Sequence, residues 1–115
     1  MHPQAAENER RALGLIGLAA RAGALARGTQ EVREAARARR LHLVLIAGDA
    51  SGNTRERLRP VLDAAGIEVI EVLDRNALGQ AAGKARLSAM GVLMASFAKP
   101  LRALLTADVP EAGEG

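Results

Sequence analysis

A run of five aliphatic side chains, Leu43–Ala47 (LVLIA), constrains the fold of this chain most strongly. Because it offers no polar face to solvent, such a run is typical of a strand that is covered on both sides. Strands of this kind belong to sheets that lie between layers of helices. The run therefore predicts an α/β protein.

Helical and strand-like patterns alternate on both sides of this run. Helices are predicted over 9–22, 29–39, 51–65, 74–82 and from 96 or 99 to 105, with further strands over 25–27, 67–72 and 91–95. Pro60 is expected at the first position of a helix that follows a short turn, and Pro100 in the first turn of the last helix. The pattern predicts a three-layer α/β/α sandwich with about five helices and a small, mixed, mostly parallel four-stranded sheet.

The 115 residues are enough for one domain with its own core. Residues 1–8 are a polar lead-in and 106–115 an acidic tail, so disorder is expected at both ends and a folded domain over 9–105. The lack of cysteine excludes disulfides and indicates a reducing compartment. No apolar run approaches the roughly 20 residues of a membrane helix, so we expect a cytoplasmic protein without membrane contact.

The distribution of charge says more than the net charge of +3. Residues 1–40 hold eight Arg and four Glu, a net +4, whereas residues 41–115 hold eight Lys or Arg and nine Asp or Glu, a net −1. Positive charge in the first third favours a nucleic acid there; a coding bias toward Arg and Ala is the alternative explanation. Phe97 is the only aromatic residue, which disfavours binding by base stacking on aromatic platforms.

The sequence RGTQEV, Arg27–Val32, begins the second predicted helix with residue types that suit a nucleic acid. Gly28 allows a backbone to approach closely, and the unpaired amides of the first turn favour a phosphate. Glu31 can accept hydrogen bonds from the N–H groups of a base edge. The ordinary alternative is a helix start in which Thr29 is the N-cap and Glu31 complements the macrodipole.

Farther along this helix, polar residues recur on the side opposite the core positions Val32, Ala35 and Ala36. Their spacing of i, i+3, i+7 and i+10 places them on one face of a helix: Gln30, Arg33, Arg37 and Arg40. This face is either a surface for a nucleic-acid backbone or an ordinary solvated face.

Several segments, in order and spacing, resemble the kink-turn-binding ribosomal protein superfamily of L-seven-Ae and L-thirty-e type, and most of all its small bacterial YlxQ-like members. The resemblance covers about residues 9–105. It is carried by LGLAARAG, RGTQEV, LVLIAGDAS, IEVIEV, LGQAAGK and SFAKPL.

The resemblance implies a non-catalytic protein that binds structured RNA, either ribosomal RNA or a kinked regulatory RNA. In that family a Gly–Thr–Asn–Glu-like helix start contacts tandem sheared G·A pairs in a kinked RNA helix. Transferred to this chain, the RNA-contacting residues are Arg27, Gly28, Thr29, Gln30 and Glu31. The loop after the LGQAAG segment covers a flipped nucleotide in the family and corresponds to Lys84–Met90.

In that loop Lys84 and Arg86 are expected to meet phosphates, and Leu87 to pack on a base. Two positions depart from the family pattern. Gln30 replaces the usual Asn, and Glu34 stands where a basic residue is usual, with Arg33 one position away. Both departures predict weaker kink-turn binding.

Other functions are less well supported by the residues. The loop Ala47–Asn53 lacks the Lys and spacing of a nucleotide P-loop, and Asp49 is expected to order the turn into the next helix. His42 has no second ligand nearby, so we expect no metal and no cofactor. No nucleophile–base pair is evident, so we expect no enzyme. The main alternative is a protein-interaction adaptor of the same fold; a monomer and association with ribosomes are further expectations.

Overall fold

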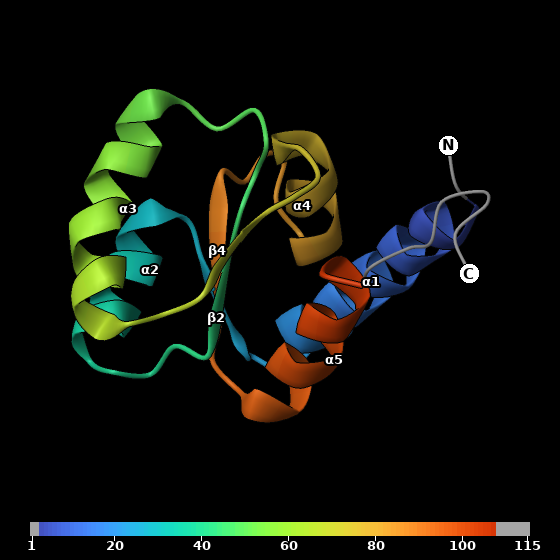
Figure 1. The fold of residues 1–115 in the computed structure, drawn as a ribbon, viewed down its shortest axis with the longest axis horizontal. Helices are drawn as coiled ribbons and strands as arrows, with labels where there is room; N and C mark the ends of the chain where they lie inside the picture. Colours follow the sequence, from blue (N-terminus) through green and yellow to red (C-terminus); the bar gives the residue numbers. More distant parts are fainter. Residues whose placement is uncertain (1–2, 108–115) are drawn as a thin grey trace.

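Helices and strands alternate along residues 3–107, the part of the chain that this computed structural model describes. They are α1 (Pro3–Arg21), β1 (Leu25–Arg27), α2 (Thr29–Arg37), β2 (Leu43–Ile46), α3 (Gly52–Ala65), β3 (Val69–Glu71), α4 (Arg75–Ala82), β4 (Ala89–Val92) and α5 (Ala95–Leu105). The sheet lies between α2 and α3 on one side and α1, α4 and α5 on the other (Figure 1). The predicted α/β/α sandwich is confirmed.

Strand β2 joins the two halves of the core, because all four of its side chains are buried. Leu43 and Leu45 pack on the side of α1, α4 and α5, and Val44 and Ile46 pack on the side of α2 and α3. Alternate side chains of a strand point to opposite faces of a sheet. The LVLIA run therefore supplies both faces at once, as its sequence predicted.

The sheet has the strand order β1-β4-β2-β3 and is mixed rather than mostly parallel. Only β2 and β3 pair in parallel, while β4 runs antiparallel to both β1 and β2. The cause lies after β3. Helix α4 is only about 12 Å long, and the chain then turns back along it, so that the Leu87 amide bonds to the Arg75 carbonyl. The chain therefore enters β4 at the same end of the strands at which it left β3, and β4 runs in the opposite direction.

Helix α1 begins at Pro3, so the predicted disorder is wrong for residues 3–8. Proline suits the first turn of a helix because its missing N–H would have no partner there. The next turns are held by a hydrogen bond from Gln4 to Asn8 at 2.9 Å and by an ion pair between Glu7 and Arg10 at 2.6 Å. Helix α5 ends at Leu105. Most of the tail predicted to be disordered, residues 108–115, lies outside the described residues.

Both internal prolines lie deeper in their helices than predicted. Helix α3 is continuous from Gly52 with Ser51 as its N-cap, and Pro60 sits within it; Pro100 is the sixth residue of α5. Each proline removes one backbone hydrogen bond, which frees the carbonyls of Glu56 and Ser96. Both of these residues are exposed, so water can bond to the freed carbonyls. The packed apolar faces keep the two helices continuous.

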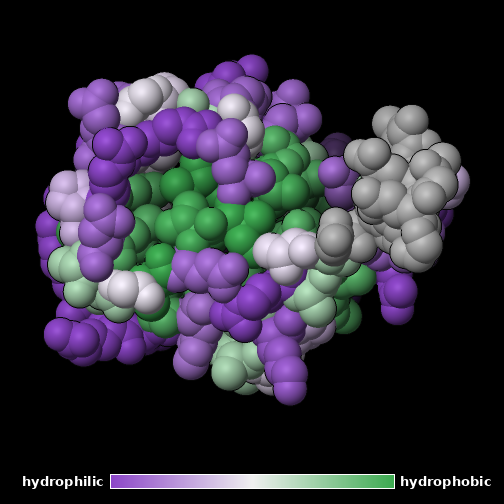
Figure 2. Space-filling model, viewed as in Figure 1, coloured by the Kyte–Doolittle hydropathy of each residue, from purple (hydrophilic) through white to green (hydrophobic). Residues whose placement is uncertain are grey.

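Strand β3 forms one open edge of the sheet, and Val69 on it is 41% exposed. Figure 2 shows a hydrophobic band along this edge, beside the hydrophilic surface of α3. Within residues 3–107, none of the helices combines the length and apolar character needed to cross a membrane.

Candidate nucleic-acid interface

The start of α2 is a sharp turn whose glycine cannot cap the helix. Strand β1 ends at Arg27, and the N-cap Gly28 has φ 103°, a region that side chains disfavour. A glycine brings no side-chain acceptor, so the amides of the first turn remain available to water or a ligand. Glu31 accepts a hydrogen bond from the Arg27 amide at 2.9 Å. One carboxylate oxygen of Glu31 thus stabilises the turn itself.

A second segment, residues 83–88, lies directly beside this turn. The Gly28 amide donates to the carbonyl of Ala89 at 2.9 Å, and the Arg27 guanidinium donates to the carbonyl of Ala82 at 3.0 Å. The structure therefore brings the start of α2 and the loop after α4 to one edge of the domain, although about 55 residues of sequence separate them.

Gly79 fixes the path of that second segment, a role that its sequence pattern alone did not predict. A Cβ at Gly79 would lie 2.7 Å from the Cα of Arg86, so only glycine lets the returning chain pass this close to α4. The available signal was a glycine inside a helical pattern, which often marks close approach of another backbone.

Within this segment the predicted RNA-contacting residues divide into two groups. Lys84 and Arg86 are exposed, and Arg86 donates to the Asn76 side chain at 3.4 Å. Leu87 is only 5% exposed and packs in the core with Leu78 and Met90. Its side chain is therefore not available to cover a base. The prediction failed because the chain enters the core just before β4 begins.

The outer face of α2 is shorter than its sequence pattern predicted. Gln30 donates to the carboxylate of Glu34 at 3.3 Å, so the two residues that depart from the expected family pattern bond to each other. Arg33 is half-buried and Arg37 is exposed on the same helix. Arg40 lies outside this face, because α2 ends at Arg37 and Arg39 takes a left-handed conformation with φ 57°.

The loop after β2 has a structural role. Asp49 accepts a hydrogen bond from the Arg75 amide at 2.9 Å, which lowers the pKa of its carboxyl below the ordinary value of 3.8; the nearby Arg75 guanidinium acts in the same direction. Ser51 caps α3 by accepting a hydrogen bond from the Thr54 amide at 3.2 Å. Asp49 thus joins this loop to the start of α4. Among residues 3–107, no group of three or more His, Asp or Glu side chains could hold a metal ion.

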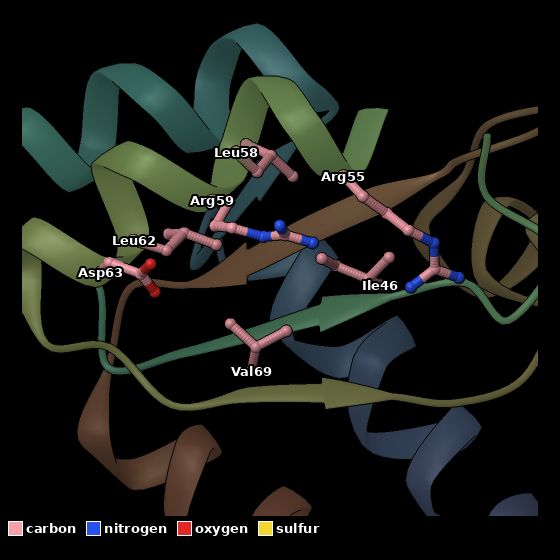
Figure 3. Close-up of a pocket in the computed structure, with 7 residues that line it drawn as sticks. All are labelled: Ile46, Arg55, Leu58, Arg59, Leu62, Asp63 and Val69. Carbon is pink, nitrogen blue, oxygen red and sulfur yellow. The ribbon is translucent and has the colours of Figure 1, made fainter. Parts of the chain in front are cut away.

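A separate hollow lies between α3 and the open edge of the sheet (Figure 3). Its floor is apolar, and the guanidinium of Arg59 extends over it. Arg55, on its rim, is held by Glu71 and by the carbonyls of Ala47 and Gly48. The hollow has a volume of about 210 Å³ and lies away from the start of α2.

Comparison with known proteins decides the family. Residues 10–100 match the ribosomal protein L7Ae/L30e/S12e/Gadd45 family. The chain belongs to this family.

Two relatives are similar to this L7Ae-family chain in both sequence and length. The RNA-binding protein YlxQ of Enterococcus faecium is 31% identical over 98 residues, which cover 85% of this chain and 94% of the relative. A protein of unknown function from Bacillus halodurans is 36% identical in sequence, with a TM-score of 0.77 over 82% of this chain and 95% of its own. The predicted resemblance is thus confirmed.

The fold is also found in a more distant protein, the 15.5kD RNA binding protein of Giardia lamblia. Its structure matches with a TM-score of 0.72 over 91% of this chain and 94% of its own, at 20% sequence identity. At that identity the match supports the L7Ae-type fold alone.

Proposed function

We propose that this chain is a non-catalytic protein that binds structured RNA at the edge formed by the start of α2 and residues 83–88. The observation that carries the proposal is the junction of these two segments through the Gly28 and Arg27 hydrogen bonds. It presents free helix amides and cations on one continuous surface. Membership of the family and the RNA-binding relative YlxQ support the same function.

The phosphate backbone is contacted by the cations of this edge. Lys84 and Arg86 on one side and Arg33 and Arg37 on the other are not engaged by any carboxylate within residues 3–107. Arginines contact phosphates through paired N–H groups, and the amides after Gly28 add an anion-binding helix start. RNA affinity should therefore fall steeply as salt rises.

The bases of a kinked helix are contacted by Thr29, Gln30 and Glu31. Glu31 keeps one carboxylate oxygen for a base N–H group while the other caps the Arg27 amide. Gln30 donates one of its amide N–H groups to Glu34, so Glu34 competes with a base edge for this side chain. We therefore propose that the protein prefers a kink-turn to a plain duplex. Its affinity for the kink-turn should be lower than that of a family member with Asn at position 30 and a basic residue at position 34. Ribosomal RNA and kinked regulatory RNA are the natural candidates.

A binding titration tests this function. The protein is titrated with a kink-turn RNA and with a plain duplex of equal length, at several salt concentrations. We expect tighter binding to the kink-turn and a log-linear loss of affinity with salt, with a slope of about −0.7 to −0.9 per phosphate contact. Arg33→Glu together with Arg37→Glu should abolish binding to both RNAs.

The variant Glu34→Lys refines the test, because it removes the acceptor that holds Gln30. We expect it to strengthen kink-turn binding. Unchanged binding by the double Arg variant, or a wild-type protein that binds neither RNA, would refute the proposed function. A partner bound without salt dependence would favour the protein-interaction adaptor instead.

A further inference from the structure

We propose that the groove between α2 and α3 is a second phosphate-contacting surface, occupied by the duplex stem that continues from the RNA at the start of α2. The inference rests on the proposed function and extends it by a second set of residues, Arg39 and Arg57. It also specifies the substrate: a kinked RNA with a long stem on the α2 side, rather than an isolated kink.

A row of arginines follows this groove. Arg37 and Arg39 line a cavity of about 160 Å³ whose other lining residues come from the facing sides of α2 and α3: Ala36, Val61, Ala64 and Ala65. Arg33 lies one turn before Arg37 on α2, and Arg57 one turn before Val61 on α3, which places both on the sides that face the groove.

The two helices run in the same direction, so the arginines Arg33, Arg37, Arg39 and Arg57 form one row along the groove. Both α2 and α3 lead from the end of one parallel-running strand to the start of the next, and they lie side by side on one face of the sheet (Figure 1). Their C-terminal halves share the cavity. Arg33 and Arg57 each lie about one helical turn before the residues that line the cavity, so they lie at a similar level along the groove. The row of arginines therefore begins close to the start of α2.

These arginines lack acidic partners. Within residues 3–107, none of Arg33, Arg37, Arg39 and Arg57 forms an ion pair, whereas Arg55, Arg75 and Arg102 on other surfaces each do. Cations held together without ion-pair partners attract an anion, and arginine binds phosphate through paired N–H groups.

Arg39 occupies a position where the backbone favours glycine. Its φ of 57° is left-handed, the conformation that glycine most often adopts just after a helix. Arg39 adopts this conformation although a side chain disfavours it, and its side chain lines the cavity. Unfavourable backbone geometry of this kind is a reason to look for a functional side chain.

The partial negative charges at the C-terminal ends of α2 and α3 repel an anion, but they are smaller than the positive charge of the four arginines. Each helix end contributes about half a negative charge, and the carbonyls of Ala35 and Ala36 already accept hydrogen bonds from the amides of Arg40 and Arg39. Four arginines outweigh two helix ends. The competing explanation is that Arg37 and Arg39 only stabilise the helix end.

The test uses two kink-turn RNAs that differ only in the stem on the α2 side. One stem is cut back to the shortest that still pairs, and the other is extended by a full helical turn. We expect wild-type protein to bind the long-stem RNA more tightly and with a steeper salt dependence. Arg39→Gly together with Arg57→Gln should remove that gain, and the salt slope should become shallower by about 1 for each arginine that no longer meets a phosphate. Binding of the short-stem RNA should be unchanged.

Arg39→Gly also separates the two explanations of this position. If Arg39 binds RNA, glycine should preserve or raise the melting temperature of the free protein while it weakens long-stem binding. A lower melting temperature with unchanged RNA binding would overturn the inference. Arg39→Lys keeps the charge and should retain most of the gain.

The outcomes distinguish the two proposals. Equal affinity and equal salt slope of the wild-type protein for both RNAs would refute the α2–α3 surface alone. Binding to neither RNA would refute the proposed function, and the inference with it.

Discussion

At the scale of single residues, Glu31 has two uses that a pair of variants can separate. Its carboxylate caps the Arg27 amide, and we propose that it also accepts hydrogen bonds from a base. Glu31→Ala removes both, so the free energy of unfolding should fall by about 0.5–1.5 kcal/mol and the preference for a kink-turn over a duplex should fall with it.

Glu31→Gln keeps an oxygen for the Arg27 amide but replaces the second acceptor with an NH₂ donor. It should keep nearly wild-type stability in urea unfolding and lose the kink-turn preference in titrations. Equal loss of affinity for both RNAs in either variant would contradict a role in base recognition.

Gly28 determines the turn into α2 through its backbone alone. A Cβ there would meet no atom within 4 Å, so Gly28→Ala is disfavoured only by its φ of 103°, a strain of about 1–3 kcal/mol. Gly14→Ala is the matched control, because Gly14 lies inside α1 with equally open space; it should raise stability by up to about 1 kcal/mol. Chemical unfolding measures both, and opposite signs are expected. A stable Gly28→Ala protein would show that the turn relaxes freely.

The structural places of some of these residues could be predicted from the sequence, and those of others could not, because some depend on local contacts and others on tertiary contacts. Gly28 and Glu31 belong to a local helix start, whose hydrogen bonds involve neighbours in sequence. Leu87 was predicted to pack on a base from the family resemblance. Its burial depends on how the segment after α4 folds back, which no local sequence pattern contains. The role of Gly79 was not predicted for the same reason, because it depends on the contact with the returning chain at Arg86.

At the scale of the elements, the prolines show tertiary packing overriding local preference. Pro60 breaks a hydrogen bond inside α3 on an exposed face, so Pro60→Ala should raise the free energy of unfolding, by at most about 3 kcal/mol. Pro100→Ala should raise the free energy of unfolding less than Pro60→Ala does, because Pro100 is half-buried beside α1 and its ring contributes packing. Thermal unfolding compares the two, and destabilisation by Pro60→Ala would contradict the account.

The link between the loop after β2 and helix α4 should depend on pH. The hydrogen bond from the Arg75 amide lowers the pKa of Asp49 in the folded protein below the ordinary 3.8. The stability that this bond contributes is therefore fully present above about pH 4 and is lost as the pH falls through the folded pKa. Asp49→Asn should be less stable than wild type at neutral pH and should approach it in acid.

Asp63→Asn is the control for that experiment, because Asp63 forms no ion pair among the described residues. Unfolding by urea across a pH series gives both comparisons. A constant difference between wild type and Asp49→Asn from neutral to acidic pH would show that Asp49 does not titrate in this contact.

At the scale of the whole molecule, the layers could be predicted and the strand directions could not. The LVLIA run required helices on both faces of the sheet, and the alternation of patterns gave the number of elements. Whether a strand returns parallel depends on where its connection ends. That was decided by the return of the chain along α4, close against Gly79, which is a tertiary fact.

We propose that RNA lies across the start of α2 and residues 83–88, and photo-crosslinking can locate it. The protein is irradiated in complex with a kink-turn RNA, and the peptides that carry nucleotides are identified by mass spectrometry. We expect crosslinks within residues 27–37 and 83–88, because the proposed interface lies there. Crosslinks confined to the exposed face of α1 and α5 would contradict it.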